Sequence, residues 1–275
     1  MNRLIIPILM MLVCFISACL PTSKQYTELE SHVFDSVDSQ SILIQVDHGE
    51  VIVLGSEDDH VEVGGQVLLA DELEYQVSST EKQISIKATT NRNNSPDKPL
   101  RVEVNVPKGT PVKVETDSAS VFVENYQGDL EVDSTSGKIT IEQIIGRIIL
   151  WSNRGDIIVR KSSGNINVAG NYGALNVQNV HGETAVSTIM GNVVFGGLIQ
   201  AGDVVRLETD HGPVSVNLDQ DSDLSLQVSS ISGDVACMVP GLSSSTRSCA
   251  GEIGAGNGTL KIRTVSGAVT LQLTP

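Results

Sequence analysis

Carboxylates and arginines are the residues of this chain whose types could support catalysis. Enzymes that cleave polysaccharides need acidic side chains clustered on one face, often beside a basic residue. The nearest such group comprises Asp117, Glu131, Asp133, Arg154 and Arg160. Asp117 and Asp133 lie at different offsets from the glycines that follow them, so we do not expect them to share a column. The sequence favours a protein without enzymatic activity, and a polysaccharide-active enzyme is the alternative.

A second group of acidic residues directly follows glycines, as in calcium-binding repeats of nine residues. These residues are Asp129, Asp156, Asp203 and Asp234. Calcium-binding rolls need two glycines and an aspartate in every unit, whereas units here have one glycine and often Lys, Arg, Asn or Ala at that place. Aspartate also favours turns through local hydrogen bonds. We therefore expect turns, and neither a metal site nor a cofactor. The same interpretation applies to the histidines directly before glycines: His48, His181 and His211.

The first cysteines point to export and membrane attachment. Residues 1–18 begin with a positive charge at Arg3 and continue with an apolar run too short to span a membrane comfortably. Ile16-Ser17-Ala18-Cys19 resembles the bacterial lipobox, in which the cysteine carries the lipid. We therefore predict a lipoprotein signal peptide, lipidation at Cys19 and a tether over residues 19–31. A plain signal peptide and a short membrane anchor are the alternatives. Leu20, in place of Asp, favours the outer membrane if the cell has one.

Cys237 and Cys249 are the only cysteines left for a pair once the signal region is set aside. An exported protein meets an oxidising environment, which favours a disulfide between them. The alternative is a free thiol at Cys237, which occupies an inward strand position. No histidine lies near the pair, so a metal site is not expected.

Charge and aromatic content limit the partners. The formal net charge is −15, which argues against nucleic acid as a partner. Aromatic residues make up 3% of the chain, and Trp151 is the only tryptophan. Because Trp151 follows the inward Leu150, it should point outward. It could stack on a sugar or contact a protein, or it could simply cover its neighbours at the rim.

A glycine recurs every ninth residue through the middle of the chain. The series is Gly128, Gly137, Gly146, Gly155, Gly164, Gly173, Gly182 and Gly191. The second and fourth residues after each glycine are almost always aliphatic, which places both on one face of a short strand. Glycine before the strand supplies a turn conformation that most residues avoid. Each unit is therefore one turn and one strand.

Alternate units differ at the position three residues before the turn. One class has a hydroxyl there: Thr116, Ser134, Ser152, Thr188, Thr209, Ser230 and Thr264, with Gly170 as the exception. The other class has Asn125, Gln143, Lys161 and Asn179. The hydroxyls share parity with the aliphatic residues and should stack inward at a corner. This predicts an all-β, parallel β-helix-like solenoid with coils of about 18 residues. An antiparallel meander or sandwich is the runner-up.

The flanking segments depart from this period. Residues 32–115 have longer strands and fewer glycines, which predicts an N-terminal β cap. The repeats then occupy 116–275, with a loop insertion at 238–257 and a last strand, 271–274, at an open edge. Ala119 stands where a glycine is usual, so that turn could be distorted.

Three features in order resemble a known family: the 47–53 strand, the 104–114 turn with its Pro-Lys-Gly-Thr-Pro, and repeats such as Ser136-Gly137-Lys138-Ile139. They are similar to widespread bacterial β-strand-repeat proteins described as candidate adhesins. The resemblance covers about residues 33–275. It implies an extracytoplasmic, non-enzymatic β-solenoid, in some cases associated with envelope-stress systems.

The predicted function is that of a lipoprotein of the cell envelope, facing the periplasm or the exterior, with an adhesin-like or structural binding role. Its expected partners are the membrane, through Cys19, and an envelope protein or glycan. An envelope-stress accessory protein that engages membrane signalling partners is the alternative.

Overall fold

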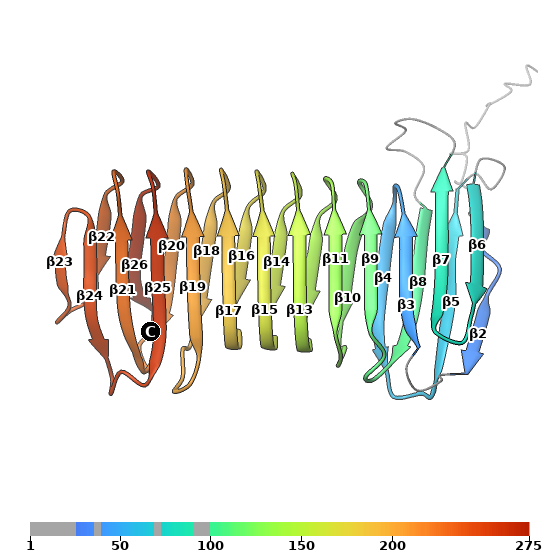
Figure 1. Ribbon diagram of the computed structural model, residues 1–275, viewed down its shortest axis with the longest axis horizontal. Helices are drawn as coiled ribbons and strands as arrows, with labels where there is room; N and C mark the ends of the chain where they lie inside the picture. Colours follow the sequence, from blue (N-terminus) through green and yellow to red (C-terminus); the bar gives the residue numbers. More distant parts are fainter. Residues whose placement is uncertain (1–25, 36–39, 69–72, 91–99, 275) are drawn as a thin grey trace, which may run out of the picture.

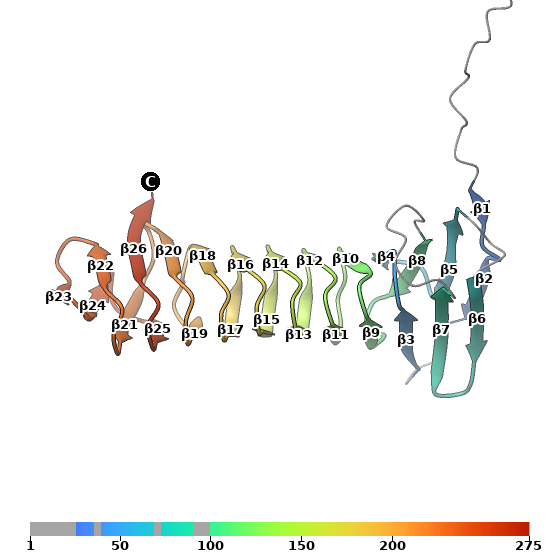
Figure 2. The same cartoon turned by 90° about the horizontal axis from the view of Figure 1, so that it is seen from above.

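The computed structural model describes residues 26–35, 40–68, 73–90 and 100–274. The regular secondary structure within these ranges consists of β-strands. The strands form two long sheets of 13 strands each, called sheet A and sheet B. The two sheets lie face to face and give the molecule an elongated shape (Figures 1 and 2). The prediction of an all-β chain with long parallel sheets is confirmed.

Both sheets run the length of the molecule. Sheet A contains, from the N-terminal end of the stack, β1 (Thr27–Glu28), β5 (His60–Val67), β8 (Leu100–Pro107), β4 (Glu50–Ser56), β10 (Ser120–Glu124), β12 (Ile139–Glu142), β14 (Ile157–Arg160), β16 (Leu175–Gln178), β18 (Val193–Gly197), β20 (Val214–Asp219), β26 (Val269–Thr274) and β22 (Val235–Met238), and β2 (His32–Asp35) also pairs with β5. Sheet B contains, from the same end, β6 (Leu73–Ser79), β7 (Gln83–Thr90), β3 (Ser41–Val46), β9 (Val112–Thr116), β11 (Leu130–Ser134), β13 (Ile145–Ser152), β15 (Ser163–Gly170), β17 (His181–Thr188), β19 (Val204–Thr209), β25 (Gly258–Thr264), β21 (Leu224–Ser230), β24 (Ser248–Ile253) and β23 (Ser243–Ser245).

From β9 to β20 the chain passes alternately through sheet B and sheet A, and one such circuit is called a coil. Each strand from β9 to β18 pairs in parallel with the strand one coil further along the chain. Val121 pairs with Ile139, and Ile139 with Ile157, so the step is 18 residues. The step grows to 21 between β17 and β19, where Val186 pairs with Leu207. Each coil therefore adds one strand to each sheet.

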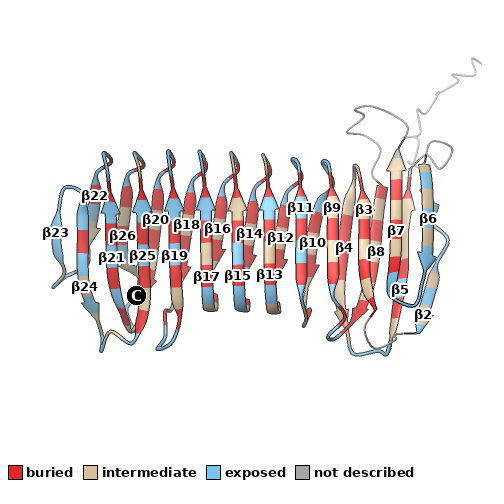
Figure 3. Cartoon of the chain, viewed as in Figure 1, coloured by how far each residue is buried: buried red, intermediate tan, exposed pale blue. Residues whose placement is uncertain are grey.

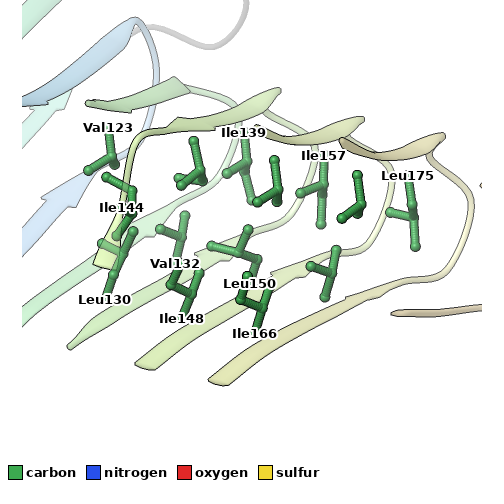
Figure 4. Packing of buried hydrophobic residues seen from close by; sticks show 14 of the residues in the cluster. Val123, Leu130, Val132, Ile139, Ile144, Ile148, Leu150, Ile157, Ile166 and Leu175 are labelled. Atoms are coloured by element: carbon green, nitrogen blue, oxygen red, sulfur yellow. The ribbon is translucent and has the colours of Figure 1, made fainter. Parts of the chain in front are cut away.

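Alternating side chains of the two sheets fill the space between them. Leu130 and Val132 of sheet B, like Ile139 and Ile141 of sheet A, are at most 1% exposed. Figure 4 shows these aliphatic residues in rows that continue from coil to coil. Buried and exposed residues alternate along most strands in Figure 3. A shift by one residue would turn the aliphatic row to water, so the alternation sets the register.

At the N-terminal end the coils do not follow chain order. β3 and β4 form the first coil of the chain, yet β7 and β8 pair with their outer edges. Ile42 of β3 pairs in parallel with Ile84 on one side and with Val112 on the other. Beyond β7 and β8, β6 and β5 run antiparallel to them. The sheets continue without a break across the boundary expected at residue 116.

The C-terminal end shows the same departure from chain order. β25 and β26, the last strands, lie inside β21 and β22: Leu260 pairs with Val205 on one side and Leu226 on the other. In the strand that was expected at an open edge, Leu271 likewise pairs with Val216 on one side and with Cys237 on the other. The segment 238–257, where a loop insertion was predicted, is not a loop throughout, because β23 and β24 form there and β24 pairs antiparallel with β21. A returning chain beside an open edge satisfies its backbone groups by adding a strand.

The expected tether ends earlier than predicted. Thr27 and Glu28 form β1, which pairs antiparallel with β5, and the amide of Leu29 donates to the carbonyl of Gly65 over 2.9 Å. Residues 27–29 of the predicted tether are therefore attached to sheet A, and residues 19–25 lie outside the described residues.

Candidate functional site

The hydroxyl residues predicted to stack form a row at the C-terminal ends of successive strands of sheet B, with their side chains buried. In spatial order the row is Thr116, Ser134, Ser152, Gly170, Thr188, Thr209, Thr264 and Ser230. The side chains are at most 9% exposed. Most accept a hydrogen bond from the amide three residues later, such as Gly155 to Ser152 over 2.8 Å. The row therefore holds the turns between the sheets and does not form a binding surface.

The regularly spaced glycines serve two purposes. Gly128, Gly146, Gly164 and Gly182 have φ angles of 100–151°, a region that favours glycine. The alternate glycines do not have left-handed φ angles: Gly137, Gly155, Gly173 and Gly191. A Cβ atom on Gly155 would lie 1.9 Å from the carbonyl oxygen of Gly137, one coil away. The turn conformation expected from the sequence explains only the first class, and close approach of backbones explains the second.

Among the residues that the structure describes, those that replace the hydroxyl in alternate units are the non-glycine positions with left-handed φ. Their φ angles are 54° for Asn125, 59° for Gln143, 50° for Lys161 and 53° for Asn179. Each ends or directly follows a strand of sheet A, where the chain must turn towards sheet B. Asn tolerates this conformation better than Gln or Lys.

Ala119 does not distort its turn. Its amide donates to the hydroxyl of Thr116 over 2.8 Å, matching the bond from Gly137 to Ser134 over 2.9 Å. The Ala119 side chain is fully buried. The expected distortion is therefore not seen in the hydrogen bond that closes this turn.

Cys237 of β22 and Cys249 of β24 form a disulfide, with Cα atoms 6.2 Å apart. β22 belongs to sheet A and β24 to sheet B, so the bond joins the two sheets near the C-terminal end of the stack. Cys249 is fully buried. The structure therefore places the pair in the bonded form and not as free thiols.

Cys19 and the expected signal peptide lie outside the described residues. In the part of the chain that the structure describes, no helix has the length and apolar character that a membrane crossing would require.

The acidic and basic residues considered for catalysis come together only in part, because Asp117 and Asp133 line one hollow of sheet B and Glu131 lines another. Asp133 pairs in register with Glu115, while Asp117 lies in the turn after β9. Arg160 ends β14 in sheet A, away from the sheet B residues. The described residues contain no group of three or more His, Cys, Asp or Glu side chains arranged to hold a metal ion.

The aspartates after glycines and the histidines before them make contacts around the turns. Asp156 accepts a hydrogen bond from the Ala174 amide over 2.8 Å. The buried Asp203 accepts from the Gly182 amide over 2.7 Å and lies 3.1 Å from Nδ1 of His181. His48 and His211 contact serine hydroxyls of adjacent coils, Ser118 and Ser266.

The outer face of sheet B has two shallow hollows near its N-terminal end, and three of the charged residues that line them, Lys113, Glu115 and Glu131, bind one another. Lys113 binds Glu131 over 3.0 Å and Glu115 over 3.1 Å. The hydrogen bond to Glu131, followed by that to Glu115, raises the pKa of Lys113. A hydrogen bond from Gln45, over 2.8 Å, and then one from Lys113 lower the pKa of Glu115. These three side chains are therefore already engaged within the protein.

A third hollow on the same face lies beside Trp151. Trp151 is on the outer side of β13 and 38% exposed, as its parity predicted. Next to it in register come two small residues, Ala169 and Ser187, and then Glu208. The small residues leave a groove between the indole and the carboxylate. This hollow is called the Trp151 groove, and Asn171, Ile189 and Asp210 also line it.

Exposed apolar side chains continue from the Trp151 groove along the adjacent turns. Tyr172 is 58% exposed, Ile189 46% and Met190 55%. Tyr172 and Met190 occupy equivalent places in consecutive coils, since each amide donates to a residue of the preceding turn. The sequence pattern identified Trp151 but not this cluster. The signal was present in the register, because residues 18 apart are neighbours across the coils.

Comparison with known proteins supports the fold. A protein from Bacteroides fragilis named as a candidate adhesin is 11% identical, with a TM-score of 0.51 over 91% of this chain and 98% of that one. A candidate cell adhesion protein from Clostridium sporogenes is also 11% identical, with a TM-score of 0.34 over 91% and 100% of the two chains. No curated protein matches the sequence. At this identity, the likeness to the Bacteroides fragilis protein shows the fold alone.

The sequence also matches a family model described as Toastrack DUF4097. The match extends over residues 39–272, which include the strands from β3 to β25 and most of β26. The resemblance to bacterial β-strand-repeat proteins described as candidate adhesins is confirmed. The chain belongs to the Toastrack DUF4097 family.

Proposed function

We propose that this protein is a lipid-anchored scaffold of the bacterial cell envelope that binds a partner on its outer face, as an adhesin does. The observation that carries the proposal is the outer face of sheet B, which presents side chains in register over many coils and includes the Trp151 groove. The name of the Bacteroides fragilis neighbour supports an adhesin-like role weakly. An envelope location accords with the lipobox-like sequence at Cys19.

The scaffold is a β-solenoid with coils of about 18 residues, closed by an N-terminal β cap. The 18-residue register from β9 to β18 supports the coil size. Antiparallel pairing of β5 and β6 outside β8 and β7 supports the cap, because it ends the parallel stack.

The scaffold acts without catalysis. Of the residues first considered for polysaccharide cleavage, Glu131 is engaged with Lys113 over 3.0 Å, and Arg160 lies on sheet A, away from the hollow that Asp117 and Asp133 line. A test is incubation of the purified protein with a panel of polysaccharides, from which we expect no shortened products. Turnover of any of them would contradict the proposal.

Recovery of ligands from intact envelopes tests the binding role. Protein coupled to beads is incubated with envelope extracts and, separately, with extracellular matrix. We expect a glycan or matrix ligand to be retained. Recovery of membrane signalling proteins alone would instead favour an accessory role in envelope stress and would contradict adhesion.

A single cysteine substitution tests the anchor. Cys19→Ala removes the expected lipid acceptor, so the variant should leave the membrane fraction. Cys14→Ala, five residues earlier within the expected signal peptide, is the matched control and should remain membrane-bound. If Cys19→Ala stays in the membrane fraction, lipidation at this residue is not the anchor.

A further inference from the structure

The floor of the Trp151 groove is formed by small side chains in two consecutive coils. Ala169 pairs in register with Trp151, and Ser187 with Ala169. Glu208 follows in the next coil. Adjacent strands are about 4.8 Å apart, so Trp151 and Glu208 stand about 14 Å apart along the stack. The groove is thus bounded by an aromatic ring at one end and a carboxylate at the other.

Polar groups in this groove are free to bind a ligand. Within the described residues, the indole N–H of Trp151 and the carboxylates of Glu208 and Asp210 make no hydrogen bond or ion pair. The amide of Asn171 donates to Asn153 over 2.9 Å, which leaves its own oxygen able to accept. The groove therefore combines an apolar ring with several hydrogen-bond acceptors and with donors at the indole N–H and the Ser187 hydroxyl.

The other two hollows of sheet B lack this combination. Neither has an aromatic residue in its lining, and Lys113, Glu115 and Glu131 bind one another there. The charges of these three residues are already satisfied within the protein. The Trp151 groove is therefore the better place for an external ligand on this face.

The chemistry of the groove selects among ligands. A pyranose ring has an apolar C–H face that can pack on an indole and hydroxyl groups that donate to carboxylate and amide oxygens. Glu208 and Asp210, within a chain of net charge −15, would repel a sulfated or acidic sugar. An uncharged sugar satisfies the acceptors without that repulsion.

We propose that the Trp151 groove binds an uncharged pyranose unit of a glycan. The proposal rests on the binding role proposed above and names the class of ligand. Trp151 stacks on the ring, Ala169 and Ser187 give it room, and Glu208, Asp210 and Asn171 accept hydrogen bonds from its hydroxyls.

Tryptophan fluorescence tests the proposal directly, because Trp151 is the only tryptophan in the chain. The full-length protein is titrated with neutral gluco-, galacto- and manno-oligosaccharides and with sialylated and sulfated glycans. We expect a saturable change with at least one neutral oligosaccharide and weaker or no binding of the charged ones. No saturable change with any neutral oligosaccharide, or a preference for the charged glycans, would overturn the assignment.

Two matched pairs of variants place the binding in the groove. Ala169→Leu fills the floor and should weaken binding by at least about tenfold, while Ala185→Leu, also outward but outside the lining, should change it by less than about twofold. On a glycan array, Trp151→Ala should lose binding, whereas Phe122→Ala on sheet A should retain it. Binding by Ala169→Leu equal to that of the unmodified protein would show that the ligand lies elsewhere.

The same variants separate this proposal from the broader one. If Ala169→Leu still retains the envelope ligand on beads, the binding scaffold stands and the groove assignment fails. If the unmodified protein retains nothing from envelopes but its fluorescence saturates with a neutral oligosaccharide, the groove binds sugar and the adhesin-like role fails.

Discussion

The coils between β9 and β20 stack in the order of the chain, whereas a coil at each end of the molecule is out of order. β3 and β4 lie between β7–β8 and β9–β10, and β25 and β26 lie between β19–β20 and β21–β22. In the middle, each coil pairs with the coil that directly precedes it in the chain. At the ends, a coil must fit between two others that are distant in sequence.

This difference shows how a parallel stack can be ended. A stack in chain order would leave parallel strands unpaired at both ends, and such edges pair readily with other chains. Here the outermost strands at the C-terminal end are β22 with four residues and β23 with three. At the other end, short β1 and β2 cover β5. Moving a full coil inward leaves short or antiparallel strands outside.

The largest effect is expected from removing the inserted C-terminal coil. Deleting residues 258–275 removes four fully buried aliphatic side chains: Leu260, Ile262, Val269 and Leu271. Their burial contributes about 6 to 12 kcal/mol. We expect β21–β24 to lose hydrogen-exchange protection while β9–β17 keep theirs, because coils depend mainly on their neighbours.

Adding the missing coil as a peptide provides the control for that deletion. A peptide of residues 258–274 should restore exchange protection in β19 and β21, which border the vacated position. If β21 is as protected in the truncated chain as in the full chain, the insertion is not needed to hold the end together.

A substitution in the middle should cost more than a matched one near the N-terminal end. Gly155→Ala places a methyl group 1.9 Å from the carbonyl oxygen of Gly137, and we expect a loss of about 3 to 5 kcal/mol in the free energy of unfolding. Gly64→Ala in β5 meets no atom within 4 Å and should change that free energy by less than about 1 kcal/mol. Urea unfolding measures both. Equal losses would show that close stacking does not explain the central glycines.

The disulfide should stabilise the C-terminal end but not the middle. Cys237 and Cys249 are 12 residues apart, and a cross-link over a loop of this size stabilises by about 3 kcal/mol through the unfolded chain. Replacing both with alanine should therefore increase cleavage of β22–β24 by a protease. Cleavage of β11–β15 should stay unchanged, and a uniform increase along the chain would contradict a local role.

The smallest effect on stability is expected from acidification at Asn257, where the chain enters the inserted coil of β25 and β26. Asp223 accepts hydrogen bonds from the side chain and backbone amide of Asn257, over 2.8 and 3.2 Å. These bonds lower the pKa of Asp223. A lowered folded pKa adds stability above the unfolded pKa, and this stability is lost as the pH falls through the folded value.

Hydrogen exchange near Asn257 measures this effect between neutral and acidic pH. The unmodified protein should lose protection there on acidification. Asp223→Asn has no proton to gain and should show a smaller change with pH. The same pH dependence in both proteins would assign the effect to other groups.

Much of the middle of the molecule could be predicted because its signals are local. The spacing from Gly128 to Gly191 and the parity of pairs such as Leu130 and Val132 indicate both strand positions and register. The outward direction of Trp151 followed from the same parity. The groove beside it did not, because Ala169 and Ser187 become its floor only when coils are stacked.

The order of coils at the ends could not be predicted from these signals. Thr209, Ser230 and Thr264 all carry the hydroxyl that precedes a turn, so either Ser230 or Thr264 could stack next to Thr209. In the structure Thr264 does so. The repeat pattern is the same in both coils and therefore contains no information about which is inner.

The amino-acid sequence by itself determined the strand, the turn, the inward face and the hydroxyl row, since each depends on residues within one coil and its period. The tertiary structure alone decided which coil lies inside another and which small residues open a groove beside Trp151. The physical reason is that parallel pairing is satisfied by any coil with the right alternation, so coil order depends on closing the edges of the whole stack.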